Sequence, residues 1–329
     1  MKSSSSIVIQ YFNCSSMGTR FDFLTYGLDE DFYLSAKTFI INELERIEQK
    51  FSRYDKKSEI SRVNKLAASE PVTTDSETIA LLNLCKVYYF QTNKLFDITV
   101  GNFTSTNDEA CLTERGNDEK KLSLSSEFSK CEYPSTIGAD KILIDLKDST
   151  VRFLSPMLSI DLGGIGKGYA LERIKHYCTE NLISNALISF GDSSITTLGS
   201  HPHGVFWPIG MQHAFSAGAP IHTFRLNDSS MSTSGNSPNN RLKFGVNGHI
   251  FNPLTREFQK EPKTISVVTN SPIDAEVLST SLFIATEKDK AEILSRFIPI
   301  ESIEISYNQI NEHKIIDLNH DFTIIAKRD

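Results

Sequence analysis

The stretch SIDLGGIGKGYALERI (residues 159–174) places four glycines and a lysine between an apolar-acidic beginning and a segment with helical character. Such turns between a strand and a helix are typical phosphate sites, because backbone N–H groups and the helix dipole face the anion. A P-loop would need glycine at Asp161 and a hydroxyl residue at Gly168; the dinucleotide fingerprint begun at Gly164 would need glycine at Tyr169. The stretch therefore indicates a phosphate-bearing ligand held in neither common way, or a purely structural turn.

A second candidate site lies in the segment AEVLSTSLF (residues 275–283). Glu276 and Thr280 are four residues apart, hence on one face of the predicted helix. A carboxylate beside a hydroxyl can hold a hard cation such as Mg²⁺, which takes oxygen ligands and often bridges substrate phosphates. The alternative is an exposed glutamate beside a threonine that bonds its own helix backbone.

Three further residues have side chains suited to a site. His249 in NGHIFNPLT stands where a strand runs into an Asn-Pro turn, and histidine is well suited to moving a proton near neutral pH. Asp97 in LFDITVG and Tyr54 in FSRYDKKSEISRVN complete the set. Taken alone, each also fits a structural role: a hydrogen-bonded histidine, a buried strand-end acid and a packing ring.

Composition narrows the class of protein. The net charge is −7 with no long basic run, which argues against nucleic-acid binding. No window reaches the roughly 18 apolar residues that a membrane span needs. Five scattered cysteines without a C-x-x-C pattern indicate neither a zinc site nor a disulfide framework. The first residues lack a secretory signal, so we expect a cytoplasmic protein, or an exported or membrane-anchored one if a signal was trimmed.

Helical periodicity marks the elements that must position these residues. Apolar residues spaced four, three and four apart predict a helix over residues 35–51. A second helix is predicted over residues 75–92, with Asp75 or Ser76 as its cap. The best-signalled helix follows Ser271, with Pro272 at its first position and Asp274 three residues after the cap.

Strand-like runs occupy much of the remaining chain. Residues 141–146 and 150–154 are predicted to form a hairpin. Beyond the glycine-rich stretch, further strands are predicted at residues 186–190, 194–199, 206–212, 221–226, 243–251 and 264–269. Residues 103–133 are polar with few apolar anchors and are predicted to be a flexible insertion. No repeat or clean linker is evident, so we predict one α+β domain over residues 1–329.

The order of the motifs adds to what each indicates alone. Met17-Gly18-Thr19, FSRYDKKSEISRVN, FDITVG, IDLGGIGKGYALE, SFGDSSITTLG, STSGN, HIFNPLT and AEVLSTSLF follow one another along the chain. This succession resembles the FAD:protein FMN transferases, the ApbE family, from about Met17 to Phe283. The resemblance implies a single-domain, T-fold-related α+β architecture with an antiparallel sheet and packed helices. It also implies an enzyme that binds FAD and Mg²⁺ and transfers FMN to a threonine or serine hydroxyl of a target flavoprotein, releasing AMP.

The resemblance also assigns roles residue by residue. Cofactor binding would fall to Met17, Tyr54, Leu95, Phe96, Asp97, Asp161, Lys167 and Ile250. The metal would be held by Gly164, Glu276 and Thr280. His249 is the family position tied to catalysis, and Lys167 would add positive charge at the pyrophosphate.

Three substitutions depart from the family pattern. Glu276 stands where the family usually has Asp, Asn252 replaces the usual Asp, and Asp192 replaces a usual glycine. Two alternative functions therefore stand beside the transferase: a Mg²⁺-dependent FAD pyrophosphatase giving FMN and AMP, and a non-catalytic FAD-binding protein.

Overall fold

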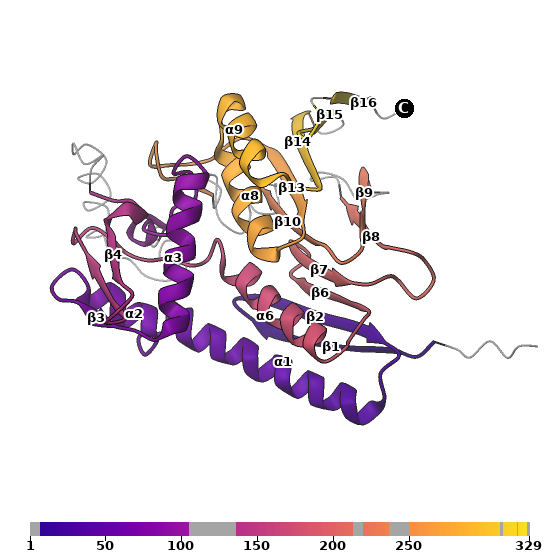
Figure 1. Cartoon of the computed structure of the whole chain (residues 1–329). Coiled ribbons are helices and arrows are strands. Elements are labelled where there is room, and N and C mark those ends of the chain that lie inside the picture. The colour runs from indigo at the N-terminus through magenta and orange to yellow at the C-terminus, as the bar shows by residue number, and fades with distance from the viewer. Residues whose placement is uncertain are drawn as a thin grey trace, which may run out of the picture.

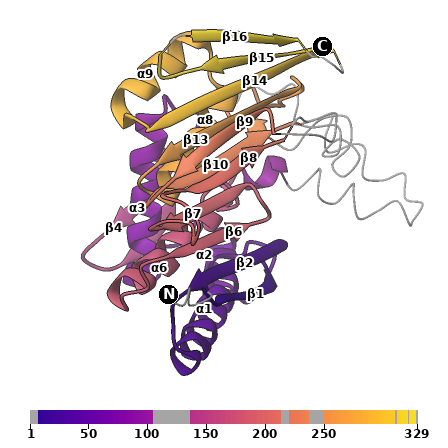
Figure 2. The ribbon, with the colours of Figure 1, turned by 90° about the vertical axis from the view of Figure 1, so that its right-hand side faces the viewer.

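The computed structural model describes residues 7–104, 136–212, 220–236, 250–309, 312–320 and 322–327. Within these ranges a nine-stranded, fully antiparallel sheet forms the centre of the molecule (Figure 2). In spatial order its strands are β1 (Ile9–Ser16), β2 (Thr19–Tyr26), β6 (Ala186–Phe190), β7 (Ser194–Leu198), β10 (Ser230–Gly235), β13 (Lys263–Thr269), β14 (Glu301–Gln309), β15 (Glu312–Asp317) and β16 (Phe322–Lys327).

Helices cover one face of this sheet (Figure 1), with α1, α6 and α8 packed against its strands and α1 and α8 also against α6. The longer helices are α1 (Glu30–Phe51), α2 (Glu59–Leu66), α3 (Ser76–Gln91), α6 (Gly166–Glu180), α8 (Pro272–Ile284) and α9 (Glu287–Phe297). A short 3₁₀ helix, η1, spans Ala139–Lys141. The buried apolar side chains of these helices and of the sheet's inner face form the main core.

Smaller strand groups complete the described chain. A three-stranded sheet joins β3 (Val72–Thr73), β5 (Thr150–Phe153) and β4 (Ile142–Asp145), and two-stranded ribbons join β8 (Trp207–Met211) to β9 (His222–Leu226) and β11 (Phe251–Asn252) to β12 (Glu257–Phe258). Trp207 and Phe224 of the β8–β9 ribbon cluster with Met231 of β10. The ribbon therefore packs on the sheet face opposite the helices.

Side-chain alternation on β10 divides this strand between the two faces. Successive side chains of a strand point to opposite sides, so Ser230, Ser232 and Ser234 share the face toward α8. Met231 and Thr233 point the other way, where Met231 joins the cluster of the β8–β9 ribbon. The central strand thus places Met231 in the apolar cluster on one side and three serine hydroxyls on the side toward α8.

The α+β class, the antiparallel sheet and the packed helices are confirmed. The helix predicted from residue 35 begins earlier, at Glu30, because Asp29 caps it by accepting the Phe32 N–H. Asp75 caps α3, and Ser271 caps α8 with Pro272 in its first turn, as predicted. Seven of the eight runs predicted as strands match described strands; of the eighth, 243–251, only Ile250 and Phe251 lie inside the described residues.

Two predictions on domain organisation stay predictions. From residue 105 onward the predicted insertion at 103–133 lies outside the described residues, whereas Phe103 and Thr104 belong to a helical turn. The assignment of residues 1–329 to a single domain is likewise not tested by the structure.

Candidate functional site

A cavity of about 570 Å³ opens between the end of β10, helix α8, the glycine-rich turn and the segment after α3. Most residues that the sequence predicts for the site line this one cavity, although they come from distant parts of the chain. They are Tyr54, Leu95, Phe96, Asp97, Asp161, Gly164, Lys167, Ile250, Glu276 and Thr280. The structure thus brings together ten of the twelve predicted site residues.

One side of the cavity, which we call the loop wall, consists of residues 95–104 and 159–164. A single isolated bridge of parallel type joins Val100 of the first segment to Ser159 of the second. The Gly101 N–H donates to the carbonyl oxygen of Ser159 at 2.9 Å, and the Asp161 N–H donates to that of Ile98 at 2.7 Å. A Cβ at Gly101 would lie 2.8 Å from the Ser159 carbonyl oxygen, so this close approach requires glycine.

Arg53, which was not among the predicted site residues, contacts both segments of the loop wall. Its Nε lies 3.3 Å from Oδ2 of Asp161, and its Nη1 donates to the Gly101 carbonyl oxygen at 2.8 Å. Its guanidinium stacks 4.5 Å from the centre of the Tyr54 ring, while that ring remains largely exposed at the cavity mouth. The motif FSRYDKKSEISRVN therefore contributes two adjacent residues to the site rather than one.

Asp161 is held from several directions. Besides Arg53, the Thr104 hydroxyl donates to Oδ2 at 3.0 Å and the Gly163 N–H donates to Oδ1 at 2.9 Å. These contacts fix the carboxylate at the start of the glycine-rich turn. Its orientation is thus set before any ligand arrives.

Asp97 also lines the loop wall, and its environment disfavours a charge. Burial raises the pKa of this carboxyl to about 6, although the backbone N–H and hydroxyl of Thr99 both donate to Oδ1 and oppose the shift. Loss of hydration is the dominant cause. Asp97 therefore changes its charge close to the neutral range.

The glycine-rich turn delivers the N-terminus of α6 to the cavity. The helix begins at Gly166, and its cap residue Ile165 supplies no side-chain hydrogen bond. Lys167, in the first turn, donates to the hydroxyls of Ser193 at 3.1 Å and Ser194 at 2.6 Å. Positive charge from the lysine and from the helix end thus meets at one side of the cavity.

Gly168 brings α6 into close contact with α8. A Cβ at this position would lie 2.7 Å from the carbonyl oxygen of Pro272 and 2.8 Å from Cγ of Glu276. The glycine is therefore required by helix packing. It places the turn that carries Lys167 directly beside the helix that carries Glu276.

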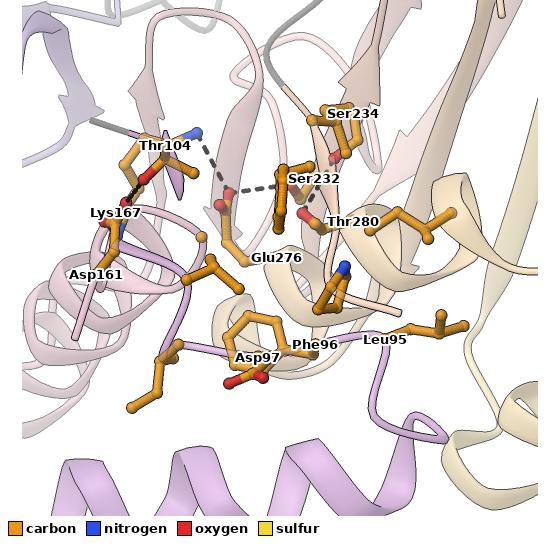
Figure 3. A pocket seen from close by; sticks show the side chains of 18 of the residues that line it. Leu95, Phe96, Asp97, Thr104, Asp161, Lys167, Ser232, Ser234, Glu276 and Thr280 are labelled. Atoms are coloured by element: carbon orange, nitrogen blue, oxygen red, sulfur yellow. Dashed lines mark hydrogen bonds and ion pairs between the residues drawn. The ribbon is translucent and has the colours of Figure 1, made fainter. Parts of the chain in front are cut away.

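The opposite side of the cavity, which we call the α8 wall, is formed by α8 and β10 (Figure 3). Glu276 is only 4% exposed; its Oε1 accepts a hydrogen bond from Ser232 at 2.9 Å and lies 3.6 Å from Nζ of Lys167. Thr280, one turn further along α8, contacts the Ser234 hydroxyl at 3.3 Å. Both serines belong to the motif STSGN, and neither was among the predicted site residues.

The donor set of the α8 wall fits a hard divalent cation. Glu276 and Thr280 offer a carboxylate and a hydroxyl oxygen, and Gly164 lines the same cavity. Within the described ranges no protein group hydrogen-bonds to Oε2 of Glu276, which leaves that oxygen for a ligand. Mg²⁺ binds through few protein oxygens and keeps waters and substrate phosphates as its other ligands.

Two predicted residues are not brought to the cavity by the described structure. Met17 sits at the β1–β2 turn with a φ of 50°, where its N–H donates to Oε2 of Glu48 at 3.0 Å, and it is not among the described residues that line the cavity. His249 lies outside the described residues.

Besides Glu276, two residues depart from the family pattern, Asn252 and Asp192, and the local structure accounts for both. Asn252 uses its Oδ1 to accept the N–H groups of Leu254 and Thr255, a turn contact that an aspartate oxygen also makes. Asp192 is exposed with a φ of 63°, a conformation that glycine adopts without strain. Neither residue is among the described residues that line the cavity.

The architecture is that of known flavin transferase structures. The structure superimposes on the flavin transferase ApbE from Vibrio cholerae with a TM-score of 0.77 at 20% identity, covering 94% of this chain and 97% of that one. For the ApbE protein from Thermotoga maritima the TM-score is 0.75 at 22% identity, with 98% and 97% covered.

Sequence comparison goes beyond the fold. The ApbE family model matches residues 17–303, so the chain belongs to the ApbE family. It is 28% identical over 254 residues to the FAD:protein FMN transferase of Chlamydia muridarum, covering 75% of each chain. It is 24% identical over 307 residues to the enzyme of that name from Klebsiella pneumoniae, covering 89% of this chain and 88% of the relative.

Among the helices of the described ranges, none combines the length and the apolar character that crossing a membrane requires. The compartment expected from the sequence stays a prediction.

Proposed function

We propose that the chain is an FAD:protein FMN transferase that moves FMN from FAD to a threonine or serine hydroxyl of a target flavoprotein and releases AMP. The observation that carries this proposal is the single cavity in which Lys167, Glu276, Thr280 and the glycine-rich turn meet. Its support comes from membership of the ApbE family and from relatives that carry this enzyme name.

The reaction is a substitution at the FMN phosphorus of FAD. The acceptor hydroxyl oxygen forms a bond to this phosphorus, the bond between the phosphorus and the bridging oxygen breaks, and AMP leaves with that oxygen. The hydroxyl proton passes to a general base, and we assign this role to His249. In-line placement of the two reactants supplies much of the rate, because it replaces a bimolecular encounter.

The cavity's own charges suit this substitution. Nζ of Lys167 lies 3.6 Å from Oε1 of Glu276, in the first turn of α6. Its positive charge would stabilise the negative oxygens of the FAD pyrophosphate. Glu276, Thr280 and the Gly164 backbone would hold Mg²⁺, which would supply positive charge to neutralise the phosphate oxygens and the leaving AMP. Asp161 and Tyr54, fixed by Arg53, would contact FAD at the loop wall.

The decisive test supplies FAD, Mg²⁺ and a flavoprotein acceptor and measures the acceptor's mass. We expect an increase equal to one FMN phosphoester, with AMP released in equal amount, and neither product when a chelator removes the metal. FMN and AMP formed without any adduct would identify a pyrophosphatase instead. FAD that stays bound and intact with Mg²⁺ present would identify a non-catalytic binder.

A further inference from the structure

A chain of hydroxyls connects Glu276 and Thr280 behind the surface of the α8 wall. The Ser232 hydroxyl donates to Oε1 of Glu276 at 2.9 Å and lies 3.0 Å from that of Ser279. The Ser279 hydroxyl lies 3.0 Å from that of Ser234, which lies 3.3 Å from Oγ1 of Thr280. Three serines, which we call the serine chain, therefore connect two side chains that share one face of α8.

The two periodicities of helix and strand create this chain. Residues three and four apart lie on one helix face, so Ser279 and Thr280 both stand beside Glu276. Residues two apart share one strand face, so Ser232 and Ser234 both point at α8. Ser279 fills the position between them and is fully buried, and Ser232 is 2% exposed.

Counting protons gives the chain a direction. Each hydroxyl has one proton, and a carboxylate only accepts, so the Ser232 proton is committed to Glu276. The contact between Ser232 and Ser279 then needs the proton of Ser279, because two facing lone pairs would repel each other. By the same reasoning Ser234 donates to Ser279, and Thr280 donates to Ser234.

A competing acceptor for Ser279 does not change this result. The carbonyl oxygen of Glu276 lies 3.2 Å from the Ser279 hydroxyl, longer than the 3.0 Å to Ser232. Donation to that carbonyl would leave Ser232 and Ser279 facing each other without a proton between them, in a buried place where an unmade hydrogen bond is costly. Only the one-way arrangement gives all four contacts a proton.

We propose that the serine chain is a positioning device for the cation that the proposed function requires. It turns Oε1 of Glu276 inward and leaves Oε2 for the cavity. It also commits the Thr280 proton to Ser234, so that the lone pairs of Oγ1 remain for the metal. Ser279 is not among the described residues that line the cavity, so it acts through Glu276 and Thr280, as a positioning residue rather than a catalytic one.

The test compares two serine-to-alanine changes on α8. Ser279→Ala cuts the serine chain, whereas Ser281→Ala removes an equally buried hydroxyl, which within the described residues donates to the carbonyl oxygen of Val277 and takes no part in the serine chain. Mn²⁺ binding is measured by electron paramagnetic resonance, with and without FAD. We expect Ser279→Ala to weaken Mn²⁺ binding by about tenfold, as loss of groups behind metal ligands commonly does. Ser281→Ala should change it less than about twofold.

The Mg²⁺ dependence of turnover gives a second measurement. Ser279→Ala should raise the Mg²⁺ concentration for half-maximal activity while leaving kcat at saturating Mg²⁺ nearly unchanged. Equal Mn²⁺ affinities for the two variants would overturn the proposal, whether both fall or neither does. Should Ser279→Ala fail to fold, Ser234→Ala cuts the same chain at its less buried end and is expected to give the same loss.

Two further variants separate this inference from the proposed function on which it rests. Glu276→Ala and Thr280→Val remove the metal ligands themselves. If these two bind Mn²⁺ as the unmodified protein does, the metal site of the proposed function is wrong and the positioning role falls with it. If they lose Mn²⁺ while Ser279→Ala keeps it, only the role of the serine chain is wrong.

Discussion

The two walls of the cavity are built in different ways. The α8 wall consists of a helix and the central strand of the sheet, and its polar groups contact one another through side-chain hydroxyls. The loop wall consists of irregular chain, fixed by backbone hydrogen bonds between residues 98–101 and 159–161 and by the side chains of Arg53 and Thr104, which both contact Asp161. Regular elements hold small groups in fixed directions, which suits a cation with strict geometry. Loops adapt more readily to the length of a dinucleotide.

Removing the carboxylate of the α8 wall should have the largest effect. We expect Glu276→Ala to lower metal-dependent AMP release by about 10²–10³-fold, the usual consequence of losing one group that stabilises developing charge. Circular dichroism should show the fold retained. Glu287→Ala, which removes a glutamate pairing with Lys290 on α9, is the control and should leave activity unchanged. Activity above a tenth of the original in Glu276→Ala would place the metal elsewhere.

The raised pKa of Asp97, on the loop wall, predicts that the stability of the protein depends on pH. Its folded pKa of about 6 exceeds the unfolded value of 3.8, so the folded state keeps a proton that the unfolded state has lost. The free energy of unfolding, relative to Asp97→Asn, should therefore fall by about 2–3 kcal/mol between pH 4 and about pH 6.5 and then level off. Urea unfolding of both proteins across this range measures the difference. A difference independent of pH would contradict the raised pKa.

Gly168 packs α6, the helix that follows the loop wall in the chain, against α8 of the α8 wall. We expect Gly168→Ala to lower the free energy of unfolding by about 1–3 kcal/mol, because the new methyl group meets backbone atoms that have no room to move. Gly166→Ala is the matched control: its Cβ meets no atom within 4 Å, and stability should stay equal or rise. Equal losses in both variants would show that the spacing of α6 and α8 is not the cause.

Arg53 should have the smallest effect, confined to binding. Lysine lacks the planar fork with which Arg53 reaches Asp161 and the Gly101 carbonyl together. We expect Arg53→Lys to raise the KM for FAD about tenfold, or about 1.4 kcal/mol, with kcat nearly unchanged. Arg62→Lys, on α2, serves as control. A fall in kcat at unchanged KM would contradict the binding role of Arg53 and indicate a role in the chemical step.

The sequence predicted what local signals determine. Helix α8 and its start could be predicted, since Ser271, Pro272 and Asp274 mark the N-terminus within four residues. The cavity could be anticipated because the family resemblance puts Lys167 and Glu276 at one site. The strand β10 could not: SMSTSG has little strand preference by itself, and its extended form is imposed by pairing with β7 and β13.

What the sequence missed depends on contacts between distant segments. Arg53 stands next to a predicted residue, yet its partners Gly101 and Asp161 lie 48 and 108 positions away in the chain. Ser232 and Ser279 are ordinary small residues until β10 and α8 face each other. The N-terminal hairpin β1–β2 and the strands β14–β16 also escaped prediction, although together they form more than half of the large sheet.

Strand β10 is the fifth of nine, with four strands on either side. The two edge strands of the sheet, β1 and β16, belong to opposite ends of the chain. Edge strands are where a sheet frays or pairs with a strand of another molecule. Four ladders of backbone hydrogen bonds separate each edge strand from β10, so a structural change at an edge must pass through all four before it affects the serines of β10. Because the site lies at the middle of the sheet, distant from both edge strands, tags or partner proteins attached at either terminus should leave the geometry of the site unchanged.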